Sequence, residues 1–276
     1  MKLFRSTSLF IQGILIAGML SACQNESDTA LAPQAPANTS DQNARTAVAA
    51  GTLIKDGNTT LAYNSQDPTL LWKESNANTQ FVFTYAPQLI SAMKFTYGNP
   101  APEYKYFLDT FGRCVQTVTD KTYIYEYNAD GQLTKIYNKY QPDERREFSY
   151  AVDATGWKKS LSTVKFYDEQ GAKTKELTFT YGGATGIPDK HPLNPDVFPA
   201  GVSKYLRIFG NFNTNLVQLL IEDKYLPNGQ KASSTTHAYS YTLGTMGKAK
   251  NITVKKINGT LVSSTDRTYT MPKYNF

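Results

Sequence analysis

The stretch formed by residues 123–136 constrains the fold more than any other part of the chain. It reads YIYEYNADGQLTKI, so aromatic side chains alternate with polar ones, a turn sequence follows, and a second alternating run begins. Successive side chains of a β-strand point to opposite faces, and glycine readily takes the positive φ that tight hairpin turns require. The stretch therefore predicts two antiparallel strands joined by a turn.

Variants of this unit recur along the chain. Turn sequences that end in glycine occur at irregular spacing, which favours a meander over a solenoid of fixed period, at residues 109–112, 128–131, 153–156 and 168–171. The 19 Tyr and 14 Phe suit a pleated, half-buried surface. We predict an all-β fold, an antiparallel meander that forms a curved sheet or a barrel-like structure, in a single domain at residues 51–276.

The alternation is interrupted around residues 182–210. Prolines that would exclude a central strand cluster here, at Pro188, Pro192, Pro195 and Pro199. We predict a long, Pro-rich, irregular connection. Connections of this length are often functional, and the alternative is a flap that covers one end of the core.

The amino terminus has the pattern of an export signal. Lys2 and Arg5 precede an apolar run at residues 9–20 that is short for a membrane span. Residues 20–23 read Leu-Ser-Ala-Cys, which resembles the lipobox of bacterial lipoproteins. That resemblance implies a signal peptide at residues 1–22 and lipidation of Cys23, with several acyl chains that anchor the protein to a membrane. The alternative is an ordinary secretory signal with a chance cysteine.

Residues 23–50 are expected to form a disordered tether behind the lipid. They are rich in Ala, Asn, Ser, Thr, Asp and Pro and contain no aromatic residue, so they bury too little apolar area to fold. Gln24 follows the cysteine, where an aspartate would resemble the inner-membrane retention signal of enteric bacteria. We therefore predict the outer membrane, and leave open whether the protein faces the periplasm or the cell surface.

Two family resemblances follow from these segments. The Tyr-x-Tyr and Asp-x-x-Gly arrangement of residues 104–181 resembles YD-type repeats. The order of lipobox, polar tether, aromatic strand-turn units, Pro-rich segment and late Tyr239-Ser-Tyr241 strand is similar to a family of Bacteroidetes lipoproteins described as porin-like. This second resemblance implies a curved or barrel-like antiparallel sheet and implies no activity.

A barrel that itself spans the membrane is disfavoured by the sequence, although the chain ends in Tyr274-Asn-Phe276 as outer-membrane barrels often end in an aromatic residue. The lipid-facing side of such a barrel is a continuous apolar band. Here one face of the expected strands carries polar groups, among them Thr178, Thr180, Ser240, Thr242 and Lys255.

The motifs of common enzymes are missing from the sequence. It has no Gly-x-Ser-x-Gly, His-Glu-x-x-His or phosphate-loop motif, and of its two histidines His191 lies in the irregular segment and His237 beside a strand. We expect both to be loop or surface residues, Cys114 to be a buried small side chain, and no metal or cofactor site. Scattered basic residues and a formal net charge of +6 indicate a solvated surface and exclude a nucleic-acid partner.

Two functional hypotheses remain. The first is a non-enzymatic binding or envelope-assembly module, whose partner is an apolar ligand, a glycan or an envelope protein, with Trp72 and Trp157 as candidate contacts because an exposed tryptophan can stack on a sugar ring or a partner. The second is an envelope glycan hydrolase that uses carboxylates from distant strands, since such pairs need not be adjacent in sequence. The first is favoured because the sequence lacks a catalytic constellation.

Overall fold

The computed structural model describes residues 50–152, 159–182 and 186–271, all of which belong to the unit Asp41–Phe276. Its elements are β-strands and one 3-10 helix: β1 (Leu53–Asp56), β2 (Thr59–Tyr63), β3 (Leu71–Ser75), β4 (Thr79–Ala86), β5 (Leu89–Thr96), β6 (Asn99–Leu108), β7 (Cys114–Val118), β8 (Thr122–Tyr127), β9 (Leu133–Asn138), β10 (Gln141–Val152), β11 (Lys159–Tyr167), β12 (Lys173–Thr180), β13 (Leu219–Tyr225), β14 (Lys231–Leu243), η2 (Thr245–Gly247), β15 (Ala249–Lys256) and β16 (Leu261–Tyr269).

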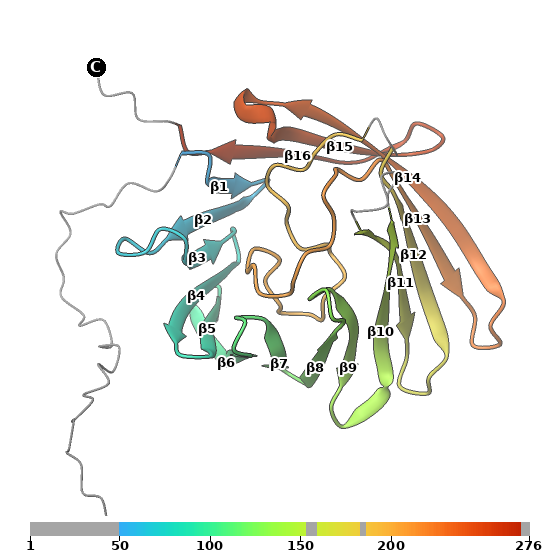
Figure 1. Cartoon of the computed structure of the whole chain (residues 1–276), viewed down its shortest axis with the longest axis horizontal. Coiled ribbons are helices and arrows are strands. Elements are labelled where there is room, and N and C mark those ends of the chain that lie inside the picture. The colour runs from blue at the N-terminus through green and yellow to red at the C-terminus, as the bar shows by residue number, and fades with distance from the viewer. Residues whose placement is uncertain (1–49, 153–158, 183–185, 272–276) are drawn as a thin grey trace, which may run out of the picture. The chain divides into compact units, whose positions relative to one another are not determined.

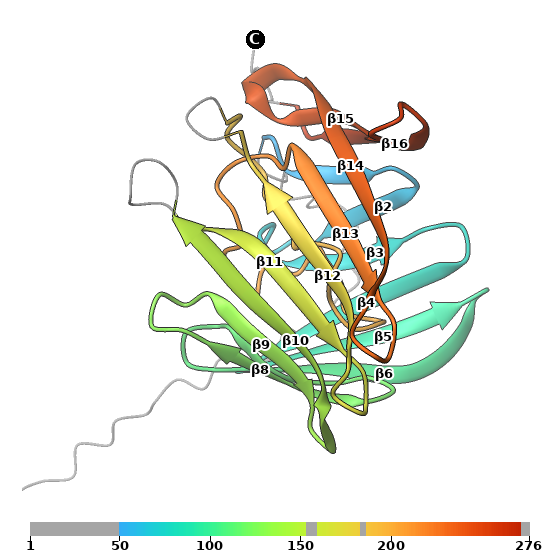
Figure 2. The ribbon, with the colours of Figure 1, turned by 90° about the vertical axis from the view of Figure 1, so that its right-hand side faces the viewer.

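The strands form a closed antiparallel barrel. Each strand pairs with its neighbour in sequence, and β1 pairs with β16 to complete the ring (Figure 1). Figure 2 shows the tilted strands β10 to β14 side by side along one wall. The predicted all-β antiparallel meander is confirmed, and the choice between an open curved sheet and a barrel is settled as a barrel.

The recurring turn sequence works as the alternating pattern predicts. Between β8 and β9, the Asn128 side chain accepts hydrogen bonds from the backbone N–H groups of Asp130 and Gln132, and Gly131 has a φ of 74°. An Asx side chain that captures nearby backbone donors stabilises such a turn. Asp109 and Asp168 make the same paired contacts at their turns. The predicted turn at residues 153–156 lies outside the described residues.

A repeated bulge and tyrosine contact shapes one end of the barrel. In β1, β3, β7, β9 and β15 the first residue is buried and a β-bulge follows it, which increases the local twist. A tyrosine from a neighbouring strand donates its hydroxyl to a carbonyl oxygen at or beside that start, in the pairs Tyr63–Leu53, Tyr85–Leu71, Tyr127–Cys114, Tyr150–Leu133, Tyr241–Val217 and Tyr269–Ala249, at 2.6–3.0 Å. These contacts satisfy both the partly buried hydroxyls and the carbonyls at the bulged end.

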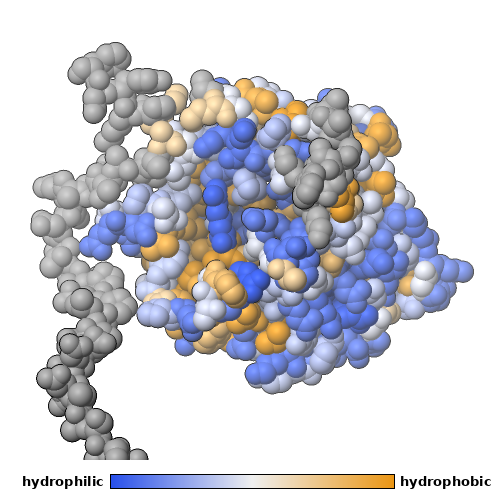
Figure 3. Space-filling model, viewed as in Figure 1, coloured by the Kyte–Doolittle hydropathy of each residue, from blue (hydrophilic) through white to orange (hydrophobic). Residues whose placement is uncertain are grey.

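The segment between β12 and β13, residues 186–218 and here called the inserted segment, fills much of the barrel. Apart from an isolated bridge between Pro188 and Asn215, it has no strand pairing. Figure 1 shows it inside the ring of strands, and in Figure 3 hydrophobic residues gather in the hollow at the same place. The predicted irregular connection is present, but the segment enters the barrel rather than lying over one end as a flap.

Aromatic contacts and backbone hydrogen bonds hold the inserted segment. The Phe198 ring lies 4.4 Å from the Phe209 ring and 5.9 Å from the Phe212 ring, measured between centroids. Phe209 and Phe212 in turn contact Tyr125 on β8 and Phe148 on β10. Backbone N–H groups at strand starts donate to the segment's carbonyls, in the pairs Cys114–Ile208 at 2.7 Å and Leu161–Phe212 at 2.6 Å.

Gly210 marks the closest approach between the inserted segment and the wall. Its φ is +84°, and a Cβ at this position would lie 2.6 Å from the carbonyl oxygen of Gly131. We expect Gly210→Ala to lower the free energy of unfolding by at least about 3 kcal/mol, because a strained φ and a backbone clash act together. Urea unfolding would measure the loss.

Gly229 provides the matched control, since its φ is +81° and a Cβ there meets nothing within 4 Å. Gly229→Ala should cost only about 1–2 kcal/mol, the strain of the left-handed backbone alone. Equal losses in the two variants would show that the contact between Gly210 and Gly131 adds nothing.

Candidate functional site

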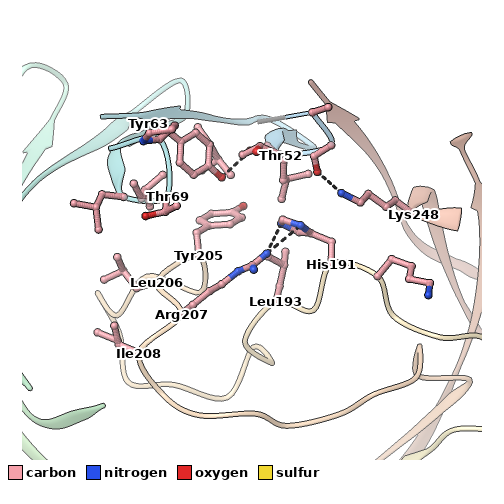
Figure 4. A pocket seen from close by; sticks show the side chains of 18 of the residues that line it. Thr52, Tyr63, Thr69, His191, Leu193, Tyr205, Leu206, Arg207, Ile208 and Lys248 are labelled. Carbon is pink, nitrogen blue, oxygen red and sulfur yellow. Dashed lines mark hydrogen bonds between the residues drawn. The ribbon is translucent and has the colours of Figure 1, made fainter. Parts of the chain in front are cut away.

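A pocket of about 480 Å³ opens at the end of the barrel where β1, β3 and β15 begin (Figure 4). We call it the mouth pocket. One side comes from strands β1 to β5 and the loop before β3, and the other from the inserted segment. The apolar side chains in its wall are Leu53, Leu61, Leu70, Leu71, Ile90, Leu193, Leu206 and Ile208.

Basic side chains gather in this apolar pocket. Lys190, His191, Arg207 and Lys248 line it, and no aspartate or glutamate of the described residues does. The Nη2 atom of Arg207 lies 3.0 Å from Nδ1 and 3.2 Å from Nε2 of His191, and Lys248 donates to the carbonyl oxygen of Gly51. Figure 4 shows Arg207 and His191 pointing toward each other within the pocket.

The charges in the mouth pocket are mutually repulsive. Burial first, and then the charges of Arg207, Lys248 and Arg267, lower the pKa of His191 to about 3. Burial and the charge of Arg207 also lower the pKa of Lys248. His191 is therefore neutral near pH 7 and can accept a hydrogen bond from Arg207. An anion placed between Arg207 and Lys248 would relieve this repulsion.

A second space, the inner cavity of about 370 Å³, lies between the inserted segment and strands β11 to β16. Apolar and aromatic side chains of the strands form one wall, among them Phe179, Tyr239, Tyr241 and Val254. The opposite wall carries polar groups of the inserted segment. Leu193 lines both this cavity and the mouth pocket, and so separates the two spaces.

Asp56 on β1 ties the inserted segment to the seam of the barrel. Its carboxylate lies 2.9 Å from Arg267 Nε on β16 and 2.8 Å from Lys204 Nζ, and accepts a hydrogen bond of 3.0 Å from the Tyr205 hydroxyl. Burial opposes ionisation, but the charges of Lys204 and Arg267 outweigh it and hold the pKa of Asp56 below its usual value. The carboxylate is a structural link between three parts of the chain.

The carboxylates of the inner cavity bear on the hydrolase hypothesis. Asp56, Asp189 and Asp196 all line it, and burial raises the pKa of Asp189. A glycosidase needs one protonated and one ionised carboxyl group across the bond to be cleaved. Asp56 is already neutralised by two cations, so it is poorly placed to act as a base or nucleophile. Neither this cavity nor the mouth pocket is lined by Trp72.

The residues proposed from sequence lie apart from these spaces or beyond the described chain. Trp72 is the bulge residue of β3, and 47% of it is exposed. Cys23 and Trp157 lie outside the described residues. Cys114 is fully buried, as predicted, and burial raises the pKa of its thiol.

His191 was expected to be a loop or surface residue. It does lie in the irregular segment, but it is partly buried in the mouth pocket. His191, Arg207 and Lys248 come from different parts of the chain and form no motif, so only the folded arrangement reveals them. Among the described residues there is no cluster of three or more metal-ligating side chains, and no helix long and apolar enough to cross a membrane.

The lowered pKa of His191 predicts a pH dependence of stability. A histidine whose pKa is depressed on folding binds fewer protons in the folded state, so the free energy of unfolding falls as pH falls from about 6.5 toward 3. Between pH 6 and 4.5, we expect the free energy of unfolding of His191→Gln to depend less steeply on pH than that of the wild type, by about 1 kcal/mol per pH unit. Urea unfolding at several pH values would measure it. An unchanged slope in His191→Gln would contradict the assignment.

Comparison with known proteins supports the fold. A porin-like protein from Bacteroides vulgatus matches with a TM-score of 0.54 and 14% identity, over 79% of this chain and 98% of that chain. A porin-like protein from Bacteroides uniformis matches with 17% identity over 78% of this chain and 89% of that chain, but its TM-score of 0.41 carries no argument. No protein-family model and no curated protein matches the chain. The chain therefore has a porin-like barrel fold like that of the Bacteroides vulgatus protein, while membership of a lipoprotein family and the likeness to YD-type repeats stay predictions.

Proposed function

We propose that the chain is an outer-membrane lipoprotein whose barrel binds a small anionic amphiphile in the mouth pocket. The observation that carries the proposal is a group of cations in an apolar pocket that, in the described part of the chain, no carboxylate lines. Elsewhere in the barrel a buried charge has a partner of opposite sign, as Arg267 has in Asp56. Pockets with an apolar wall and a few convergent polar groups are the usual form of small-molecule sites.

The pocket's free donors define the ligand's polar group. The hydroxyls of Tyr63 and Tyr205 are already used, because they donate to Leu53 and Asp56. Arg207 and Lys248 have further N–H donors to offer, and an arginine fork suits a carboxylate, sulfate or phosphate. The leucine-rich wall would bury an alkyl chain or ring system attached to that group.

The outer surface supports a barrel that stands in water beside the membrane. Outward-facing side chains on β10 to β14 form charged and aromatic pairs, in which Arg145 contacts Tyr167 and Glu147, and Lys173 contacts Tyr225 and Glu176. A membrane-spanning barrel has an apolar outer band and a polar interior. Here the outside of this part of the wall is charged and the core around the inserted segment is largely apolar, so we propose that lipid on Cys23 supplies the membrane attachment.

Binding of decanoate to the purified full-length chain tests the mouth pocket. We expect isothermal titration calorimetry to detect decanoate binding that weakens as salt rises, because the headgroup contact is electrostatic. Arg207→Met should weaken binding at least about tenfold, the loss of about 1.4 kcal/mol. Decanol, which has the same chain without the charge, should bind at least about tenfold more weakly than decanoate.

Lys224→Met is the matched control for this experiment. Lys224 lies on β13, its side chain is 62% exposed, and it does not line the mouth pocket. The control should bind decanoate as the wild type does. Equal binding of decanol and decanoate, or undiminished binding by Arg207→Met, would refute an anion site in the mouth pocket.

Membrane attachment through Cys23 is tested separately. Replacement of Cys23 by Ser removes the thiol that a diacylglyceryl group would modify. We expect the variant to move from the membrane fraction to the soluble fraction, with no acyl-chain mass on its amino-terminal peptide by mass spectrometry. Cys114→Ser, which alters the buried cysteine, should leave the protein in the membrane fraction. Retention of Cys23→Ser in membranes would show that another part of the chain anchors it.

A further inference from the structure

A third pocket, of about 310 Å³, lies at the opposite end of the barrel from the mouth pocket. It lies where β10 begins and β11 ends, beside the turn that joins β11 to β12. We call it the rim pocket; its lining includes Tyr123, Glu144, Arg146, Phe166, Asp168 and Glu169. It shares no lining residue with the mouth pocket or the inner cavity.

Arg146 is the unusual residue of the rim pocket. Strand register places it on the inward face of β10, opposite Ile136 and Phe166. The centre of its guanidinium group lies 5.4 Å from the centroid of the Phe166 ring. Its Nη1 atom is buried and has no hydrogen-bond partner among the described residues. Arg145, its neighbour on the outward face, contacts both Glu147 and Tyr167.

The acidic side chain that acts on Arg146, Glu144, is also engaged by three other groups. The Glu144 carboxylate is 2.8 Å from Lys121 Nζ and accepts hydrogen bonds from Asn138 at 2.8 Å and Tyr123 at 3.1 Å. Burial lowers the pKa of Arg146, with partial compensation from nearby groups. On β12, Lys175 Nζ lies 4.1 Å from the centroid of the Phe166 ring, which places a second positive charge near that ring. A buried guanidinium N–H group without a hydrogen bond destabilises the fold unless an acceptor completes it.

The other groups of the rim pocket restrict which anion would fit. Asp168 uses one carboxylate oxygen for two backbone N–H groups of its turn, and Glu169 contacts Lys121 at 3.1 Å, so each has acceptor capacity left. Tyr123 and Phe166 supply aromatic surface. These acceptors would repel a ligand that is anionic throughout, but they would accept hydrogen bonds from hydroxyl groups.

We infer that the rim pocket binds an acidic sugar of the uronic acid type. The sugar carboxylate pairs with the guanidinium of Arg146, the apolar face of the ring lies on Phe166, and ring hydroxyls donate to Asp168 and Glu169. This site is independent of the amphiphile site in the mouth pocket, because the two share no residue. The proposal therefore stands or falls separately from the proposed function.

Calorimetry with the purified full-length chain tests the inference, with D-galacturonate and D-glucuronate as probes. At least one of the two should bind, and D-galactose and acetate should each bind at least about tenfold more weakly, because neither offers both the charge and the ring. Arg146→Met should weaken uronate binding at least about tenfold. Arg146→Lys should restore only part of it, since an ammonium group lacks the planar fork.

Thermal stability separates a binding role of Arg146 from a structural one. If Arg146 serves ligand binding and does not stabilise the fold, Arg146→Met removes a buried charge with an unpaired N–H group. This raises the Tm of the ligand-free protein by about 2–4 °C. Lys165→Met is the matched control, because Lys165 is adjacent to Phe166 in sequence, faces the outside and does not line the pocket. It should change neither binding nor Tm.

Four outcomes would overturn the inference. These are absence of binding by both uronates, undiminished binding in Arg146→Met, a lowered Tm in that variant, and acetate binding as tight as that of the uronates. The last would leave an anion site that does not select a sugar. The proposed amphiphile site would be unaffected by any of these results, since its test uses decanoate and Arg207.

Discussion

The width of the barrel is the constraint on which the rest of the structure depends. Small barrels fill their interior with their own side chains, whereas sixteen strands enclose a space too wide for that. The inserted segment supplies the missing core, with Phe198, Phe209 and Phe212 packed against the aromatic faces of the strands. An irregular backbone inside a barrel must also satisfy its carbonyl groups. The strand starts meet this need, because residues next to a bulge, such as Cys114, donate their N–H to the segment while their carbonyls accept from tyrosine hydroxyls.

This filling is incomplete, and the charges in the spaces that remain fall into two kinds. Asp56 with Lys204 and Arg267 is a closed set of opposite charges that joins the segment to the seam of the barrel. Arg207 with Lys248, and Arg146 at the other end, are positive charges in partly buried pockets without such compensation. Structural ion pairs can also have perturbed pKa values, so perturbation alone does not identify a site. Arg207 and Lys248 are better candidates because their repulsion has no evident structural return, and Arg146 because one of its buried N–H groups has no hydrogen-bond partner among the described residues.

The fold class could be predicted from sequence because its signals are local. Alternation in residues 123–127 and the side-chain contacts of Asn128 act within a few residues of one another, so they can be read without knowledge of the partner strand. Closure could not be predicted, because pairing of β1 with β16 joins residues more than 200 positions apart. The prolines of residues 188–199 correctly indicated an irregular connection, but not that Phe209 and Phe212 would enter the barrel.

The candidate site was missed for the same reason: His191, Arg207 and Lys248 are ordinary residues until the inserted segment brings them to the strand starts. Trp72 was selected as a possible exposed contact, and it is exposed at the bulge of β3, but it lines neither the mouth pocket nor the inner cavity.

The position of Leu193 has a consequence for the size of ligand that the barrel can hold. It lines both the mouth pocket and the inner cavity, and a ligand whose apolar part exceeds the first space would have to displace it to reach the second. Displacement would expose the ligand's tail to Phe179, Tyr239 and Val254, which are themselves apolar or aromatic, so the cost is mainly the rearrangement of one leucine. The rim pocket has no such connection. The inserted segment therefore does more than fill the barrel: its residue Leu193 lies between two of the remaining spaces, whereas none of its residues lines the rim pocket at the far end.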